Sequence, residues 1–433
     1  MQTPVLMRLG SRNGSPAVIG QLSWGVLSQA LSSGGNFLCL ILAARNGSAA
    51  DLGAVASALT IYLVAIGSAR SLLSEPLLIR HQDDRTEFGQ RKSSTSAFYL
   101  GCLLSVALAF AQAILYTGGS RLRPELVWLS ACLPFLLFLD GRRYQLFAIN
   151  RPIGSAILDG SWVIVFLLGV ALKGNPGSLG VWQCWCGSGA TIGLIAIVQS
   201  RGLAGFRSSV SWLRSNLDLG SRFLAESLSS GLAVSLSLGL YSVRSGPLVV
   251  GSIRSAISLF GPLIVIYLGT QPTLLGIAQR SVADLRRVAR ISTGIMVFSA
   301  GVLTLLLLLL PDRVGREILG QTWLGARKQI LLVGLATLAS VSSTGAVLGL
   351  RALAAAGSSL RARLLSAPFA VLAPLSLGAV LGGSGFALGY ATANIITSCL
   401  LWRAFHLERR ARMTLDGLGR QPAKSLGHGT SPE

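Results

Sequence analysis

Charged side chains are scarce in this sequence. They make up 12% of its 433 residues, and only 16 residues are acidic. Some stretches, such as residues 297–310, contain no ionisable side chain, while 51% of the chain is hydrophobic. Soluble domains usually carry about a quarter of their residues as charges. The composition therefore excludes a soluble enzyme.

Groups that could perform catalysis are also few. The three histidines, His81, His406 and His428, lie far apart, so no nucleophile triad or metal-ligand cluster is expected. The six cysteines fall inside apolar segments, which predicts small buried residues and no disulfide framework. No glycine-rich phosphate loop with a lysine is present, and every loop is short. We therefore expect no enzyme activity, no metal, no cofactor and no ATP-driven transport by this chain alone.

The chain instead contains about twelve apolar segments, most of them about twenty residues long or longer. At about 1.5 Å per residue, a helix of that length crosses a hydrocarbon layer of about 30 Å. We predict an all-α polytopic membrane protein with about twelve transmembrane helices. The predicted spans are 19–44, 52–79, 96–117, 124–148, 153–173, 178–200, 223–243, 247–279, 288–310, 326–350, 360–382 and 384–403. The first is too long for a signal-peptide core and lacks a convincing cleavage site, so we expect it to be retained.

The basic residues predict the orientation. The formal net charge is +21, and the Lys and Arg residues lie mainly between apolar segments, where cationic loops stay in the cytoplasm. Placing both termini in the cytoplasm puts most of the 37 basic residues there. We therefore expect a multi-pass protein of the inner (plasma) membrane and no nucleic-acid partner. Residues 404–433 read as a disordered basic tail, which either fixes the topology or contacts anionic lipid headgroups.

Two short matches predict an internal repeat. The hexapeptide at 29–34 (QALSSG) recurs at 226–231 as ESLSSG, and the tripeptide SEP at 74–76 is echoed by TQP at 270–272. Because the two offsets are almost equal, we expect two six-helix lobes of the same orientation, related by an axis along the membrane normal. The predicted regions are 1–18 (cytoplasmic segment), 19–200 (first lobe), 201–222 (cytoplasmic linker), 223–403 (second lobe) and 404–433 (tail).

The run 28–80, with its motifs at 29–34 and 69–78, resembles the polysaccharide-transporter (Wzx-like) branch of the MOP superfamily. The segment 253–263 of the eighth span resembles the corresponding part of those proteins. The resemblance implies a V-shaped, two-lobed flippase that moves a polyprenyl-(pyro)phosphate-linked sugar or oligosaccharide to the outer leaflet for cell-surface polysaccharide synthesis. It also implies contact with membrane lipids and with glycan-synthesis enzymes.

Two arginines lie inside predicted spans, where a charge costs at least about 2.5 kcal/mol. Arg70 is followed one helical turn later by Ser74, and Arg254 is followed by Ser258 at the same spacing. The helix face that carries each Arg–Ser pair either packs closely against a neighbouring helix or lines a wet central cavity. In a cavity, the four residues would bind the phosphate of the lipid-linked sugar, because a guanidinium grips two oxygens and stays charged.

Acidic residues inside spans could couple transport to a proton or sodium gradient. Glu226 is the best placed, and Asp159 is the second candidate, with Glu75 and Asp140 behind them. Structural roles compete with this hypothesis. Glu75 precedes a proline at a probable kink, Asp140 could pair with a neighbouring arginine, and Asp159 could lie near the cytoplasmic end.

Two alternatives stand beside the flippase. A drug/cation antiporter of the sister MATE branch would need an aromatic and acidic cavity, whereas this chain places arginines in its spans. A non-transporting scaffold of a polysaccharide-synthesis complex is the other alternative. Measuring flux in reconstituted vesicles would separate the three.

Overall fold

The computed structural model describes residues 15–80, 87–117, 123–149, 151–245, 247–278, 284–319 and 323–418, which are almost entirely helical. The helices are α1 (Ser15–Arg45), α2 (Ala49–Ala69), the π-helix η2 (Arg70–Ser74), α3 (Glu75–Arg80), α4 (Glu87–Thr117), α5 (Pro124–Ala148), α6 (Pro152–Lys173), α7 (Gly177–Gln199), α8 (Phe206–Ser245), α9 (Pro247–Ser258), α10 (Pro262–Ala278), α11 (Leu285–Leu308), α12 (Asp312–Leu319), α13 (Trp323–Val341), α14 (Thr344–Ala352) and α15 (Ala356–Leu418).

These helices reproduce the predicted spans. Within the described residues, ten helical stretches are long and apolar enough to cross a membrane, and α9 with α10 forms one further span bent by 42°. The stretch counted as a single span within α15 contains two, because its backbone breaks at Gly382. The prediction of an all-α protein with about twelve membrane-spanning helices is confirmed.

The chain reverses direction inside α15. Gly382 has φ 63° and ψ −147°, a conformation that side-chain-bearing residues avoid. The two arms then pack antiparallel at very short range. A Cβ on Gly385 would lie 2.0 Å from the carbonyl oxygen of Leu377, and one on Gly389 would lie 2.3 Å from that of Ala373. Glycine is therefore required along this contact. The reversal at Gly382 coincides with the boundary that the sequence predicts between the spans 360–382 and 384–403.

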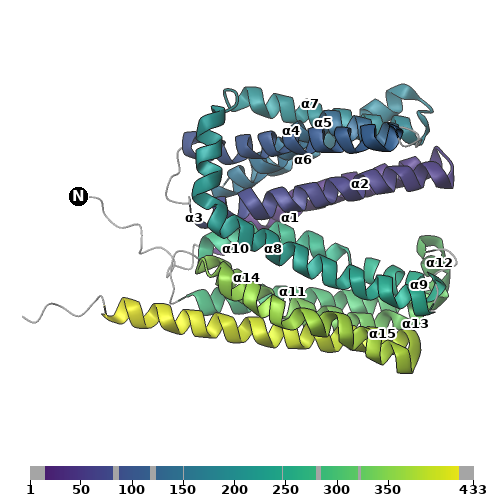
Figure 1. Ribbon diagram of the computed structural model, residues 1–433, viewed down its shortest axis with the longest axis vertical. Helices are drawn as coiled ribbons and strands as arrows, with labels where there is room; N and C mark the ends of the chain where they lie inside the picture. The colour runs from purple at the N-terminus through teal and green to yellow at the C-terminus, as the bar shows by residue number, and fades with distance from the viewer. Residues whose placement is uncertain are drawn as a thin grey trace, which may run out of the picture.

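The helices form two lobes (Figure 1). Helices α1 to α7 form the first lobe, and the second contains α9 to α15 together with the later part of α8. Figure 1 shows the lobes close together near α3, α8 and α10, and farther apart where α2 and α9 lie. Large apolar side chains such as Leu172, Phe298 and Val380 are exposed on the outside of the lobes, as expected of surfaces that face lipid.

Two predicted regions differ from the structure. The segment 201–222, predicted as a linker, is helical from Phe206 onward, and a Cβ on Gly220 would lie 2.4 Å from the carbonyl oxygen of Leu72. The predicted disordered tail is helical as far as Leu418, since Phe405 is buried and the hydroxyl of Ser358 donates to Glu408. The rest of the tail, 419–433, and the segment 1–14 lie outside the described residues.

The short helix α12 connects two spans and carries the acidic residue Asp312. The indole Nε1 of Trp323 donates to its Oδ1 over 2.7 Å, and Arg327 also contacts this oxygen. These hydrogen bonds, that of Trp323 first, lower the pKa of Asp312 below its ordinary value.

Candidate functional site

Helix α2 widens into the π-helix η2 where Arg70 enters the first lobe. The cause is Pro76, which cannot donate a backbone hydrogen bond and whose ring crowds the carbonyl four residues earlier. The backbone N–H of Glu75 instead donates to the carbonyl of Arg70, five residues before it. π-Helical turns of this kind occur frequently at functional sites. This turn holds Arg70 and Ser74, both predicted site residues, and Ser74 is buried.

Arg70 is paired with Asp140 of α5. Its Nε donates to Oδ2 over 2.9 Å and its Nη2 donates to Oδ1 over 2.7 Å, while its guanidinium carbon lies 5.6 Å from the ring centre of Tyr144. Asp140 is buried, and the Arg70 side chain is 14% exposed. The bidentate contact leaves Nη1 of Arg70 outside the pair.

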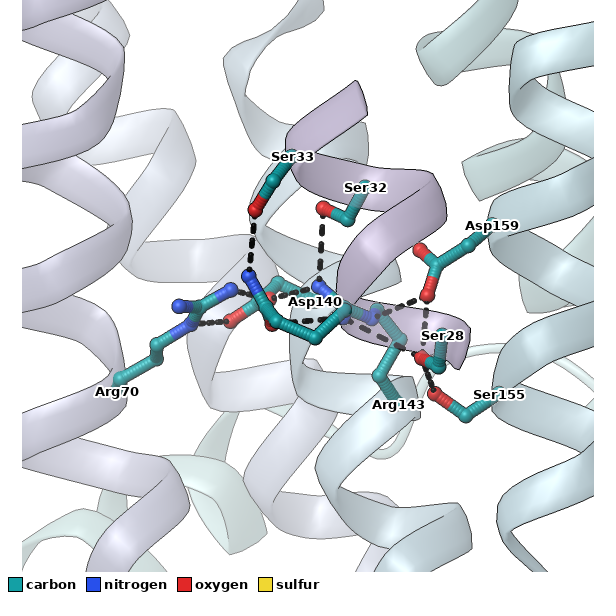
Figure 2. A network of polar contacts seen from close by, with 9 residues as sticks. Ser28, Ser32, Ser33, Arg70, Asp140, Arg143, Ser155 and Asp159 are labelled. Atoms are coloured by element: carbon teal, nitrogen blue, oxygen red, sulfur yellow. Dashed lines mark hydrogen bonds and ion pairs between the residues drawn. The ribbon is translucent and has the colours of Figure 1, made fainter. Parts of the chain in front are cut away.

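A second arginine, Arg143, extends this network (Figure 2). Its Nη1 lies 3.1 Å from Oδ1 of Asp140, and its Nε lies 3.0 Å from Oδ2 of Asp159. The hydroxyl of Ser28 donates to the same Asp159 oxygen over 2.5 Å and shares a hydrogen bond of 2.7 Å with Ser155. The charges of two guanidinium groups and two carboxylates thus balance inside the first lobe. Asp159, predicted as an ion-coupling residue, is one of these two carboxylates.

Sequence reasoning did not assign Arg143 to the site and considered only neighbouring arginines as partners for Asp140. The available signal was the spacing of three residues between Asp140 and Arg143 inside an apolar span, which places both side chains on one helix face. The pairing of Asp140 with Arg70, 70 positions earlier, requires the tertiary structure.

A third arginine, Arg351 of α14, joins the two lobes. Its Nη2 lies 3.1 Å from Oε1 of Glu75 on α3, and its Nη1 donates over 3.1 Å to Oε1 of Gln271 on α10. Glu75 and Gln271 occupy equivalent positions in the predicted repeat (SEP and TQP). Arg351 thus contacts one residue of each lobe at positions that the predicted repeat makes equivalent.

Glu226, predicted as the main ion-coupling residue, lies inside the second lobe. It is 3% exposed, and Nε of Arg363 donates to its Oε1 over 2.7 Å. Its repeat equivalent, Gln29, accepts a hydrogen bond of 3.3 Å from Arg143. Both positions therefore face an arginine, and the cationic partner of Glu226 is supplied by the protein.

The lobes enclose one cavity between them and the second lobe contains another. The cavity between the lobes has a volume of about 280 Å³, and its walls include Arg70, Glu75, Tyr144, Gln271 and Arg351. The cavity in the second lobe has a volume of about 490 Å³. Tyr267 of α10 lines both.

The four predicted substrate-binding residues are not brought together. Arg70 lines the cavity between the lobes, and Ser74 is buried beside it in η2. Ser258 lines the cavity of the second lobe. Arg254 is exposed, lines neither cavity, and has no hydrogen bond or ion pair to any of the described residues.

The lobes also touch directly where α1 crosses α10. A Cβ on Gly25 would lie 2.2 Å from the carbonyl oxygen of Gly269, and one on Gly269 would lie 2.6 Å from Cα of Val26. This close backbone crossing and the Glu75–Arg351 ion pair both connect the lobes.

No protein-family model matches the chain, and neither does any curated protein. Solved structures do resemble its fold. One is the outward-facing conformation of a multidrug resistance MATE family transporter of the MOP superfamily (TM-score 0.75, 12% identity, 91% of this chain and 96% of that chain). Others are a MOP superfamily transporter from Pyrococcus furiosus (0.74, 12%, 94% and 96%) and a mutant Vibrio cholerae MATE transporter (0.70, 14%, 92% and 98%).

These similarities define the class by fold. The chain is a multi-pass membrane protein with the two-lobed fold of MATE transporters of the MOP superfamily. At 12–14% identity the likeness concerns the fold alone. This likeness in fold does not support the polysaccharide-transporter branch that the sequence motifs resemble.

Proposed function

We propose that the protein is a secondary transporter that moves its cargo between the two lobes by alternating access. The main support is the ion pair of Glu75 with Arg351, which links the lobes beside the cavity between them. Breaking and re-forming this contact would open and close that end of the cavity. The close crossing of Gly25 and Gly269 supplies a contact about which the lobes could rock.

The charge distribution supports an orientation for this transporter. Arg80, Arg351 and Arg361 lie near the linked ends of the lobes, and α15 ends with further arginines. Under the positive-inside rule these ends face the cytoplasm of an inner (plasma) membrane, with both termini on that side. The cavity would then be closed toward the cytoplasm.

The fold neighbours favour a MATE-like drug or cation antiporter as the first candidate. Two of the three similar structures are described as MATE transporters, one of them as a multidrug resistance protein. Glu75, Tyr144 and Tyr267 in the cavity wall are groups that could contact an organic cation. Protonation of Glu75, whose Oε2 is buried without a hydrogen bond, would weaken its attraction to Arg351 and couple lobe opening to a proton gradient.

A second candidate is the flippase for a polyprenyl-linked sugar, which the guanidinium groups of Arg70 and Arg351 favour. Both line the cavity, and Glu75 is the one carboxylate that lines it with them in the part of the chain that the structure describes. A phosphate entering there could take up Nη1 of Arg70 and compete with Glu75 for Arg351. For the Pyrococcus furiosus neighbour, a binding pocket of reverse polarity is described as suggesting a different function.

Proteoliposomes would test the transporter and separate the cargoes. One set would follow ethidium movement under an imposed pH or sodium gradient, and the other the exposure of a fluorescent polyprenyl-diphosphate disaccharide to a membrane-impermeant quencher. Gradient-driven ethidium flux would support the antiporter, and glycolipid exposure would support the flippase. Each flux should fall in Glu75→Gln and stay unchanged in Arg313→Gln, whose charge is exposed on α12. Absence of both fluxes from folded protein would contradict transport and favour the scaffold.

A further inference from the structure

The cavity of the second lobe is larger than the one between the lobes and has a different lining. Its volume is about 490 Å³, within the range of pockets that hold small molecules. Helices α9, α10, α11, α13, α14 and α15 all contribute to its walls. Polar residues in its walls include Ser258, Thr337, Thr344, Arg363, Asn394 and Thr397.

Two broken helices meet at this cavity. The break between α9 and α10 follows Ser258, and the break between α13 and α14 precedes Thr344. Both residues line the cavity, as does Gly261 inside the first break. Irregular backbone at membrane depth is tolerated where it is buried in protein or lines a wet cavity. Two breaks at one cavity therefore indicate a polar, hydrated interior.

The cavity wall offers hydrogen-bond acceptors. The hydroxyls of Thr337, Thr344 and Thr397 donate to backbone carbonyls three or four residues earlier in the chain, over 2.8, 2.8 and 2.9 Å. The Nδ2 group of Asn394 likewise donates to the Tyr390 carbonyl over 3.0 Å. The three hydroxyl protons and one of the two Nδ2 protons of Asn394 are used in this way, so the hydroxyl oxygens and Asn394 Oδ1 remain to accept hydrogen bonds. A ligand with hydroxyl groups can donate hydrogen bonds to these oxygens.

Among the described residues that line the cavity, Arg363 is the only charged one. Its contact with Glu226 uses Nε, which leaves both Nη groups, and its side chain is 23% exposed. A guanidinium fork binds phosphate or carboxylate oxygens and repels cations. The acceptor wall alone would suit an ammonium ion, but Arg363 disfavours one.

We infer that this cavity binds a hydroxyl-bearing anion, such as a sugar phosphate, with the anionic group at Arg363 and the hydroxyls at the acceptor wall. A free metabolite and a lipid headgroup share this chemistry. The inference rests on the proposed transporter, because Tyr267 lines both cavities and so places this site next to the space between the lobes. Binding can nevertheless be measured without flux.

The test is equilibrium binding of radiolabelled glucose 1-phosphate to the full-length protein in phosphatidylcholine nanodiscs. We expect saturable binding that unlabelled glucose displaces at least tenfold more weakly than glucose 1-phosphate, since glucose lacks the anion. Asn394→Leu, which keeps the shape and removes the acceptor, should weaken binding several-fold. The double variant Glu226→Gln/Arg363→Gln should weaken it tenfold or more while leaving no buried charge unpaired. Arg361→Gln removes an exposed arginine two residues away and should bind as the wild type does.

Nanodiscs containing phosphatidylinositol separate the two sources of ligand. Loss of glucose 1-phosphate binding in them would identify a lipid headgroup as the occupant, and unchanged binding would identify a free sugar phosphate. Either result supports the site. No binding to folded wild-type protein, or equal affinity in the wild type, Asn394→Leu and the double variant, would overturn it. Flux of a cargo with no glucose 1-phosphate binding would refute the site and leave the transporter proposal intact.

Discussion

Exchanging Glu75 and Gln271 tests whether the ion pair at Arg351 links the lobes. Both side chains contact this guanidinium, at 3.1 Å each, but Glu75 belongs to the first lobe and Gln271 to the second. The double variant Glu75→Gln/Gln271→Glu keeps one carboxylate beside Arg351 and so leaves no buried charge unpaired. It transfers the charged contact from the space between the lobes into the second lobe, and its folded stability should stay near that of the wild type.

The magnitude follows from the bond that is changed. A glutamine at position 75 can still accept a neutral hydrogen bond from Arg351, so the loss between lobes is the difference between a charge-assisted and a neutral bond, about 1–2 kcal/mol. That corresponds to an increase of about 5- to 30-fold in the population with the linked ends open. Glu75→Gln alone should open these ends to a similar extent.

Spin labels on Lys173→Cys and Arg313→Cys, in a cysteine-free background, would report this shift as a pulsed-dipolar distance distribution. Lys173 ends α6 in the first lobe and Arg313 lies on α12 in the second, both exposed and at the opposite end from Arg351. Opening the linked ends should bring the labels closer together. Identical distributions in the wild type and the exchange variant, with equal transport rates, would show that the pair does not control the lobes.

Three further predictions concern stability. Asp140→Asn should lower the free energy of unfolding by about 3–5 kcal/mol, because it leaves Arg70 and Arg143 with one carboxylate; thermal unfolding in detergent measures this, and an unchanged midpoint would refute the charge balance. Gly389→Val should prevent the antiparallel contact within α15, lowering folded yield in fluorescence-detected size exclusion, while the exposed Gly294, which lies in helix α11 with open space around it, should accept Ala at small cost. The pKa of Asp312 is lowered in the fold, so its carboxylate stabilises the folded protein at pH values above its ordinary pKa of about 4. This stabilisation is lost as the pH falls through the lower pKa of the folded state. Asp312→Asn should therefore be less acid-sensitive than the wild type in unfolding scans.

The fold was largely predictable because membrane spans leave a direct record in composition. Segments 360–382 and 384–403 were separable because a glycine stands between two apolar runs, and the structure reverses there. The limits of the basic tail were less predictable. Composition suggested disorder from residue 404, but Phe405 is buried and Glu408 accepts a hydrogen bond within the lobe. Local polarity did not reveal these tertiary contacts.

The candidate site was only partly predictable, because charge inside a span shows that a partner is needed without showing which one. Arg70 was identified on this ground, and its partner Asp140 lies 70 positions away. Arg254 satisfied the same sequence criterion, yet its side chain is exposed and outside both cavities. The difference arises from the rotation of α9 about its own axis. A stripe of glycine and serine does not predict this rotation, because both faces of α9 contain small residues.

The two lobes use their charges differently at positions that the predicted repeat makes equivalent. Gln29 and Glu226 both face an arginine, but the first lobe adds Asp140 and Asp159 and so balances its two arginines with two carboxylates. In the second lobe a single carboxylate holds Arg363 by one nitrogen. A balanced network inside a lobe favours rigidity, since moving any member leaves a buried charge unpaired. The lobe with the incomplete pair also contains the larger cavity and both broken helices, so ligand-dependent rearrangement is expected in the second lobe.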